Sequence, residues 1–226
     1  MPSTCLMVLG VPRSGTSCVA GVLHKLGVDM GAGHFQPTDW ANPRGYYEDM
    51  RWRLATQRVT GKGYSLKAAS LERVGKTQRR IWRELARTCA QNRLWGMKDP
   101  WLCFVARFIW PILREQGVEV RMVVTRRPRE ASIASVRGHL RRTYGGKGDA
   151  ARIVDTWQAG LDRQLELWQG PMYAVDYNAL VDDPLPNVQE LADYAYVGVG
   201  RVNGDVHKAA HWVTPRLRHH EHEGVQ

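Results

Sequence analysis

The residues best suited to chemistry lie in the stretch 10–17, GVPRSGTS, between an apolar segment and a segment with helical periodicity. A tight turn there would present free backbone N–H groups and the positive end of a helix dipole to one point, which suits a phosphate. A nucleotide triphosphatase loop carries lysine directly after its second glycine. Here Thr16 follows Gly15, and the nearest cation is Arg13. The sequence therefore predicts a phosphate-binding turn that makes no lysine contact with β- and γ-phosphates.

The elements that must position this turn alternate between strands and helices. The predicted strands are residues 4–9, 94–97, 118–125 and 172–176, and the predicted helices are 15–26, 48–59, 71–91, 101–115, 129–142, 151–168, 177–181 and 187–196. Such alternation is typical of βα units. We therefore expect an α/β fold with a P-loop-like parallel β-sheet flanked by helices.

Basic residues follow three of the four predicted strands. Arg13 follows the first strand, Lys98 the second, and Arg126 and Arg127 the third. Ligands of parallel sheets collect at the carboxyl ends of the strands. Cations that converge there would bind a ligand with several anionic groups.

Composition limits the class of protein. The chain has 226 residues, of which 43% are hydrophobic and 24% charged, as expected for one globular domain with a substantial core. The formal net charge of +10 favours anionic partners. No apolar run is long enough to span a membrane, and the N-terminal segment lacks the basic start of a signal peptide. The four cysteines have no metal-binding spacing, which favours reduced thiols and a cytoplasmic location.

The helical pattern fades after Gly198. A single domain is therefore predicted over residues 1–198, with residues 199–226 as a C-terminal tail. The tail carries His219, His220 and His222, for which a solvated chain end is favoured over a metal site. The tryptophans inside the domain are interpreted mainly as packing residues. They are Trp82, Trp95, Trp101, Trp110, Trp157 and Trp168.

Five segments in order resemble the sulfotransferases that use 3′-phosphoadenylyl sulfate (PAPS), especially a bacterial branch with an RSGTS loop. The segments are 12–17 (PRSGTS), 42–49 (NPRGYYED), 95–100 (WGMKDP), 123–128 (VVTRRP) and 175–184 (VDYNALVDDP). Asn178 stands where the family usually has glutamate. The resemblance implies that PAPS is the cofactor and that its 5′-phosphosulfate binds the first segment. The residues concerned are Pro12, Arg13, Ser14, Gly15, Thr16 and Ser17.

The resemblance also implies an arginine and a serine that bind the 3′-phosphate. In the family the arginine lies two residues before a proline and eight before the serine. Here Arg126 lies two residues before Pro128, but Arg127 lies eight before Ser135. We therefore expect Ser135 with one of the two arginines, and Ser132 as the alternative serine.

Sulfuryl transfer is an in-line displacement whose needs are comparable to those of phosphoryl transfer. Cations must stabilise charge on the transferring and leaving oxygens, and a base must take the acceptor's proton. Lys98 is expected to contact the sulfuryl group, and Arg13 the leaving phosphate; no metal is required. The candidates for the base, in order of preference, are Glu48, Asp99 and Asp49, with His34 left open.

Two other functions compete with this one. A P-loop kinase or nucleotide hydrolase is suggested by the strand 172–176, which ends in an aspartate, but the missing loop lysine argues against it. A nucleic-acid or polyanion binder is suggested by the basic stretch 73–93, but no groove-reading motif supports specific nucleic-acid binding. For a transferase, the expected partner is a small-molecule or carbohydrate acceptor, and the net charge favours an anionic or sugar one.

Overall fold

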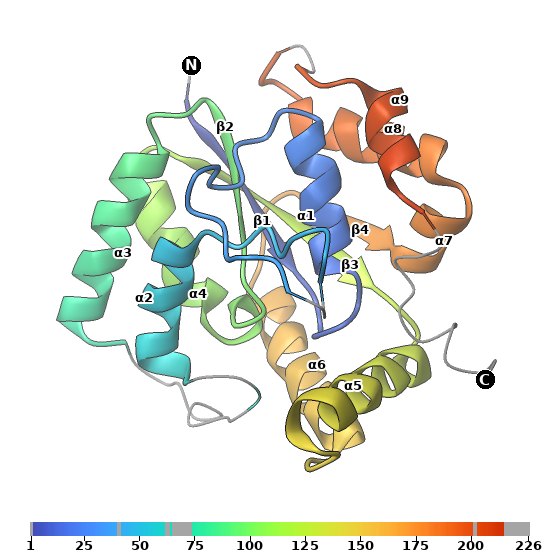
Figure 1. Ribbon diagram of the computed structural model, residues 1–226. Coiled ribbons are helices and arrows are strands. Elements are labelled where there is room, and N and C mark those ends of the chain that lie inside the picture. Colours follow the sequence, from blue (N-terminus) through green and yellow to red (C-terminus); the bar gives the residue numbers. More distant parts are fainter. Residues whose placement is uncertain (1, 40–41, 62–63, 65–73, 201–202, 215–226) are drawn as a thin grey trace.

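A four-stranded parallel sheet forms the centre of the protein (Figure 1). The computed structural model describes residues 2–39, 42–61, 64, 74–200 and 203–214, so the three histidines after residue 218 lie outside it. The strand order is β2-β1-β3-β4. The strands are β1 (Thr4–Leu9), β2 (Leu94–Lys98), β3 (Glu119–Arg126) and β4 (Met172–Asp176). The parallel α/β architecture predicted from the sequence is therefore confirmed.

Helices cover both faces of the sheet (Figure 1). They are α1 (Thr16–Lys25), α2 (Met50–Thr60), α3 (Lys76–Cys89), α4 (Leu102–Glu115), α5 (Arg129–Tyr144), α6 (Ala150–Glu166), α7 (Tyr177–Asp182), α8 (Pro184–Tyr196) and α9 (Val206–Trp212). Helices α2, α3 and α4 lie on one side of the sheet, and α1, α8 and α9 lie on the other.

The central strand β1 divides the core into two clusters, because successive side chains of a strand point to opposite faces. All six residues of β1 are buried. Met7 and Leu9 join the cluster that contains Trp52 of α2, whereas Leu6 and Val8 join the cluster beneath α1 and α8. A strand buried on both faces reads as a continuous apolar run, which is why the sequence predicts β1 correctly.

The register of the sheet brings the strand ends together. Val8 is opposite Lys98 on β2 and opposite Val123 on β3. Arg126, at the end of β3, is opposite Asp176, at the end of β4. The loops that follow the strands therefore meet at one edge.

Helix α9 was missed by the sequence analysis, which predicts no element after residue 198. The helix begins after Asp205, whose carboxylate accepts a hydrogen bond of 3.1 Å from the Lys208 N–H. Ala209 and Ala210 are buried, and α9 packs against α8 and α1. Seven residues with two small apolar side chains give too short a pattern to stand out. The domain boundary itself stays a prediction.

The remaining boundaries differ by a few residues. Helix α8 begins at Pro184 rather than at residue 187, because proline is well tolerated in a first helical turn. Residues 71–73, predicted as the start of α3, lie outside the described residues. Within the described ranges, no helix combines the length and the apolar content that crossing a membrane requires.

Candidate active site

The turn between β1 and α1 is built on two glycines. Gly15 has a φ of +99°, a conformation that glycine adopts without strain, and a Cβ there would overlap the ring of Tyr177. A Cβ on Gly10 would lie 2.6 Å from Ser14 Oγ. Among the described residues, no side chain caps the N-terminus of α1. The first amides of α1 can therefore donate hydrogen bonds to an anion.

This turn forms part of a cavity of about 330 Å³ at the carboxyl edge of the sheet. Most of the residues predicted from the sequence line it, namely Pro12, Arg13, Gly15, Thr16, Ser17, Glu48, Lys98, Arg127 and Ser135. Ser14, Asp99 and Arg126 do not, and neither do the alternatives His34, Asp49 and Ser132. The topology thus brings residues from four separate parts of the chain to one wall.

Arg127 and Ser135 lie beside the turn. The Arg13 side chain donates a hydrogen bond of 3.2 Å from Nε to Ser135 Oγ, and Arg127 Nη1 donates one of 3.1 Å to the Arg13 carbonyl. The Arg127 guanidinium also lies 4.9 Å from the ring centroid of Tyr177. Arg126, by contrast, is exposed at the end of β3, and Ser132 is buried away from the cavity.

Lys98 and Glu48 form a buried ion pair on the cavity wall, with an Nζ–Oε1 distance of 2.5 Å. Lys98 also donates a hydrogen bond of 3.0 Å to Ser17 Oγ, in the first turn of α1. Arg53, on α2, pairs with the other carboxylate oxygen of Glu48. Burial lowers the pKa of Lys98 to about 7, and the positive charges of Arg53 and Arg13 contribute to this lowering.

Arg53 was not predicted from the sequence as a site residue. Its signal would have been its place at the start of a helix, five residues after Glu48. That spacing indicates nothing until the loop before α2 is known to fold back onto β2.

Asp49 and Asp99 bind nearby backbone and side-chain groups and do not line the cavity. Asp49 caps α2 by accepting a hydrogen bond of 2.9 Å from the Arg51 N–H. Asp99 accepts hydrogen bonds from the Trp101 N–H at 2.9 Å and from Thr56 Oγ1 at 3.0 Å. Burial raises the pKa of Asp99. Both carboxylates therefore stabilise the segments that carry the cavity residues, without facing the cavity themselves.

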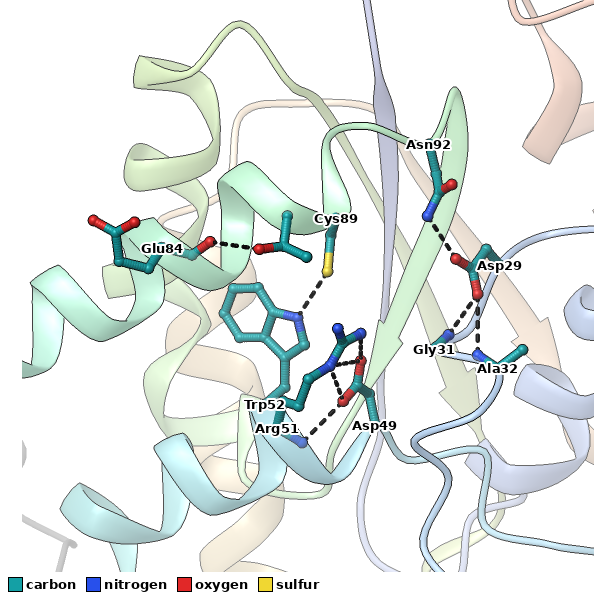
Figure 2. Close-up of polar contacts among 10 residues, drawn as sticks. Asp29, Gly31, Ala32, Asp49, Arg51, Trp52, Glu84, Cys89 and Asn92 are labelled. Atoms are coloured by element: carbon teal, nitrogen blue, oxygen red, sulfur yellow. Dashed lines mark hydrogen bonds and ion pairs between the residues drawn. The ribbon is translucent and has the colours of Figure 1, made fainter.

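The loop that carries Glu48 is held at both ends (Figure 2). At its start, Asp29 accepts hydrogen bonds from the N–H groups of Gly31 at 2.9 Å and Ala32 at 3.1 Å, and from Asn92 Nδ2 at 2.6 Å. At its end, Asp49 binds the Arg51 side chain as well as its N–H. These contacts fix Glu48 in front of β2.

The comparisons with known proteins agree with this geometry. A model of the sulfotransferase family matches residues 6–199. The chain belongs to the sulfotransferase family. A search of curated proteins returns no match.

Solved structures share the fold of this sulfotransferase at low sequence identity. Sulfotransferase STF1 from Mycobacterium tuberculosis is 20% identical with a TM-score of 0.51, over 93% of this chain and 71% of that one. The sulfotransferase domain of the Synechococcus olefin synthase is 19% identical with a TM-score of 0.52, over 92% and 76%. A sulfotransferase domain from the curacin biosynthetic pathway is 16% identical with a TM-score of 0.50, over 93% and 83%.

The rest of the cavity wall of this sulfotransferase is aromatic. Trp101 and Trp157 are buried in the core, as expected for packing residues, but they also line the cavity. Tyr64, which follows α2, and His139 and Tyr144, on α5, line it too. Their positions depend on long-range packing, so no local pattern in the sequence groups them.

Proposed function

We propose that this sulfotransferase transfers a sulfuryl group from PAPS to a hydroxyl group of a small-molecule acceptor. One observation carries the proposal. A turn suited to phosphate, an arginine–serine pair and a buried lysine–carboxylate pair line the same cavity. Each of these features answers one chemical need of the reaction.

The residues present fit a nucleotide with phosphates at both ends. The uncapped first turn of α1 and Arg13 suit the 5′ end, since backbone amides and a guanidinium both donate to phosphate oxygens. Arg127 and Ser135 suit the 3′-phosphate. Their hydrogen bonds with Arg13 hold the residues for the 3′-phosphate next to those for the 5′ end. We prefer Arg127 to Arg126 for this role because Arg126 is exposed and does not line the cavity.

The bound nucleotide would supply an activated sulfuryl group. Lys98 Nζ stabilises negative charge on the oxygens of that group, and Ser17 Oγ orients the ammonium. Glu48 takes the proton of the acceptor hydroxyl at a carboxylate oxygen. Arg13 stabilises charge on the leaving phosphate.

Glu48 is the best candidate for the base because its carboxylate lines the cavity and contacts Lys98. Asp49 caps α2, and Asp99 accepts hydrogen bonds from the Trp101 N–H and the Thr56 hydroxyl, so both are assigned a positioning role. His34 is exposed, and its place among the described residues is outside the cavity lining.

A binding titration tests the proposal. We expect 3′-phosphoadenosine 5′-phosphate (PAP), the nucleotide product of the reaction, to bind more tightly than ATP or ADP, and magnesium to leave its affinity unchanged. Transfer of labelled sulfate from PAPS to a panel of acceptors then tests the reaction. Tighter binding of ATP with magnesium, and none of PAP, would refute the proposal.

The alternative of a P-loop kinase rested mainly on the aspartate at the end of β4. Asp176, which ends β4 and would resemble a magnesium-binding aspartate, instead accepts hydrogen bonds from the N–H groups of Asn178 and Ala179 at 2.8 and 3.1 Å. It therefore caps α7, and it is not among the residues that line the cavity.

A further inference from the structure

Five aromatic side chains form a continuous row along the cavity, which we call the aromatic wall. Successive ring centroids lie 5.2 Å apart from Trp101 to Trp157, 5.8 Å from Trp157 to Tyr64, 5.8 Å from Tyr64 to His139 and 6.2 Å from His139 to Tyr144. All five residues line the cavity. Each pair lies within the range of favourable ring contacts, so the row forms a single apolar surface.

The aromatic wall begins at the end of the cavity where transfer would occur. Trp101 follows Lys98 by three residues, at the end of β2. Tyr177 begins α7, directly after β4, and the Arg127 guanidinium above it follows β3, so both lie on the opposite side of β1. A nucleotide gripped at Arg127 and Gly15 would extend from that side toward Lys98. The aromatic wall runs from Trp101, near Lys98, to α5, where His139 lies one helical turn after Ser135. Its Trp101 end is therefore the end next to the point of transfer.

We propose that the aromatic wall binds the acceptor and that this acceptor is a phenol, a planar ring with a hydroxyl group attached directly to it. This inference rests on the proposed function and adds the substrate class. It departs from the anionic or sugar acceptor that the net charge of the chain favours.

The aromatic wall presents flat ring faces with N–H and O–H groups only at the ring edges, and its His139 and Tyr64 side chains are neutral at pH 7. Burial and the charges of Arg13 and Arg142 lower the pKa of His139, and burial raises the pKa of Tyr64 to about 12. Within the described ranges, the indole N–H of the buried Trp157 has no hydrogen-bond partner. A phenol can stack its whole ring on these faces, whereas a sugar in the same position turns hydroxyl groups toward them and leaves those groups without partners, at a free-energy cost for each. An aromatic ring needs no such partners.

The acidity of the acceptor hydroxyl also favours a phenol. Two cations, Lys98 and Arg53, flank the Glu48 carboxylate and offset its negative charge. Such a group is best matched to a hydroxyl that releases its proton readily. A phenol has a pKa of about 10, whereas that of water is about 15.7.

The transfer step balances with these groups. The phenol oxygen forms a bond to sulfur while the bond between sulfur and the bridging phosphate oxygen breaks. The phenol proton passes to a carboxylate oxygen of Glu48. The electron pair of the broken bond stays on the phosphate oxygen, which Arg13 stabilises.

The test compares acceptors in a labelled-PAPS transfer assay on the whole chain. The probes are 2-naphthol, its saturated counterpart decahydro-2-naphthol, and a disaccharide. We expect kcat/KM for 2-naphthol to exceed that for each of the other two by at least about tenfold, since ring contacts and hydroxyl acidity both favour it. Equal or faster transfer to the saturated alcohol or the disaccharide would overturn the inference.

Variants of two tyrosines of the aromatic wall separate the effect of ring contacts on kcat/KM from the effect of hydroxyl acidity. Tyr64→Leu and Tyr144→Leu should each lower kcat/KM for 2-naphthol about fivefold, mainly through KM, while the affinity for PAP stays unchanged. Tyr144 is 45% exposed, so its replacement leaves the core intact. The matched control is Tyr173→Leu: Tyr173 stacks on Tyr194, away from the cavity, and its variant should keep full activity.

Failure of the inference is distinct from failure of the proposed function. A protein that binds PAP and sulfates only the disaccharide retains the proposed function and refutes the phenol. Unchanged kinetics with 2-naphthol in both Tyr64→Leu and Tyr144→Leu would also refute the phenol inference. A protein that does not bind PAP refutes the proposed function itself.

Discussion

Replacing Lys98 with alanine gives the sharpest test of the proposed chemistry. The ammonium contacts Glu48 at 2.5 Å and Ser17 at 3.0 Å, while the arginine–serine pair lies elsewhere on the cavity wall. Lys98→Ala should therefore remove charge stabilisation during transfer and leave nucleotide binding largely intact. Lys98 is only 5% exposed, so its charge acts in surroundings that screen it poorly.

The size of the effect follows from comparable groups. Loss of one preorganised donor at a site of developing charge costs about 10²–10³-fold in kcat, or about 2.7–4 kcal/mol. The variant should still fold, because Arg53 remains paired with Glu48 and no buried carboxylate is left alone. We expect the affinity for PAP to stay within about threefold, a change of less than about 0.7 kcal/mol, because PAP lacks the sulfuryl group that Lys98 is proposed to contact.

The assay pairs labelled-PAPS turnover with calorimetric titration of PAP. Lys76→Ala is the matched control, since Lys76 is an exposed lysine at the start of α3 and should keep full activity. Unchanged turnover in Lys98→Ala would remove Lys98 from the mechanism. A loss of PAP affinity of more than about tenfold would instead make Lys98 a nucleotide-binding residue.

Four further outcomes are expected. Because burial lowers the pKa of Lys98 to about 7 and the ammonium form is required, turnover of the wild-type chain should fall as the pH rises through that value, far below the usual lysine pKa. Arg127→Ala should weaken PAP binding about tenfold or more by calorimetry, whereas Arg126→Ala should change it less than threefold. Asp99→Ala should lower the free energy of unfolding in urea by about 1–3 kcal/mol, since the Trp101 N–H loses its buried acceptor and the Thr56 hydroxyl loses one of two. The pKa of His139 is lowered, so the unfolded chain binds more protons below about pH 6.5; stability should rise from about pH 5 to about pH 7, and less so in His139→Gln.

Strands whose surroundings are uniform along their length could be predicted from the sequence. The run 4–9 is buried on both faces, so every residue is apolar or small, and the prediction coincides with β1. The strand 172–176 also coincides with β4, because its end is marked by an aspartate that caps the next helix. Helix α9 has no comparable signal, since only two of its residues, Ala209 and Ala210, are buried.

The cationic side of the site was also within reach of the sequence. Parallel strands must end at one edge, so Arg13, Lys98 and Arg127 could be expected to converge without knowledge of the loops. The choice between Arg126 and Arg127 could not be made, because it depends on how the chain turns after β3. In the structure the turn leaves Arg126 exposed and directs Arg127 to the cavity.

The other side of the site could not be predicted, because it depends on loops and long-range packing. Glu48 was identified from its motif. Its ion pair with Arg53, however, forms only because α2 begins two residues after Glu48. Tyr64 and Trp157 are 93 residues apart in the sequence, yet their ring centroids lie 5.8 Å apart. No spacing in the chain encodes such a contact.

The ion pair of Lys98 and Glu48 is better explained by chemistry than by stability. Removing two charges from water costs several kcal/mol for each ion, and well-packed apolar residues in their place are often as stable or more so. Here both groups are at least 95% buried, yet they stand beside the uncapped first turn of α1. A site that must bind anionic oxygens and accept a proton within a few ångströms needs a cation and a carboxylate in one place. Arg53 and Ser17 supply the additional contacts that make their burial tolerable.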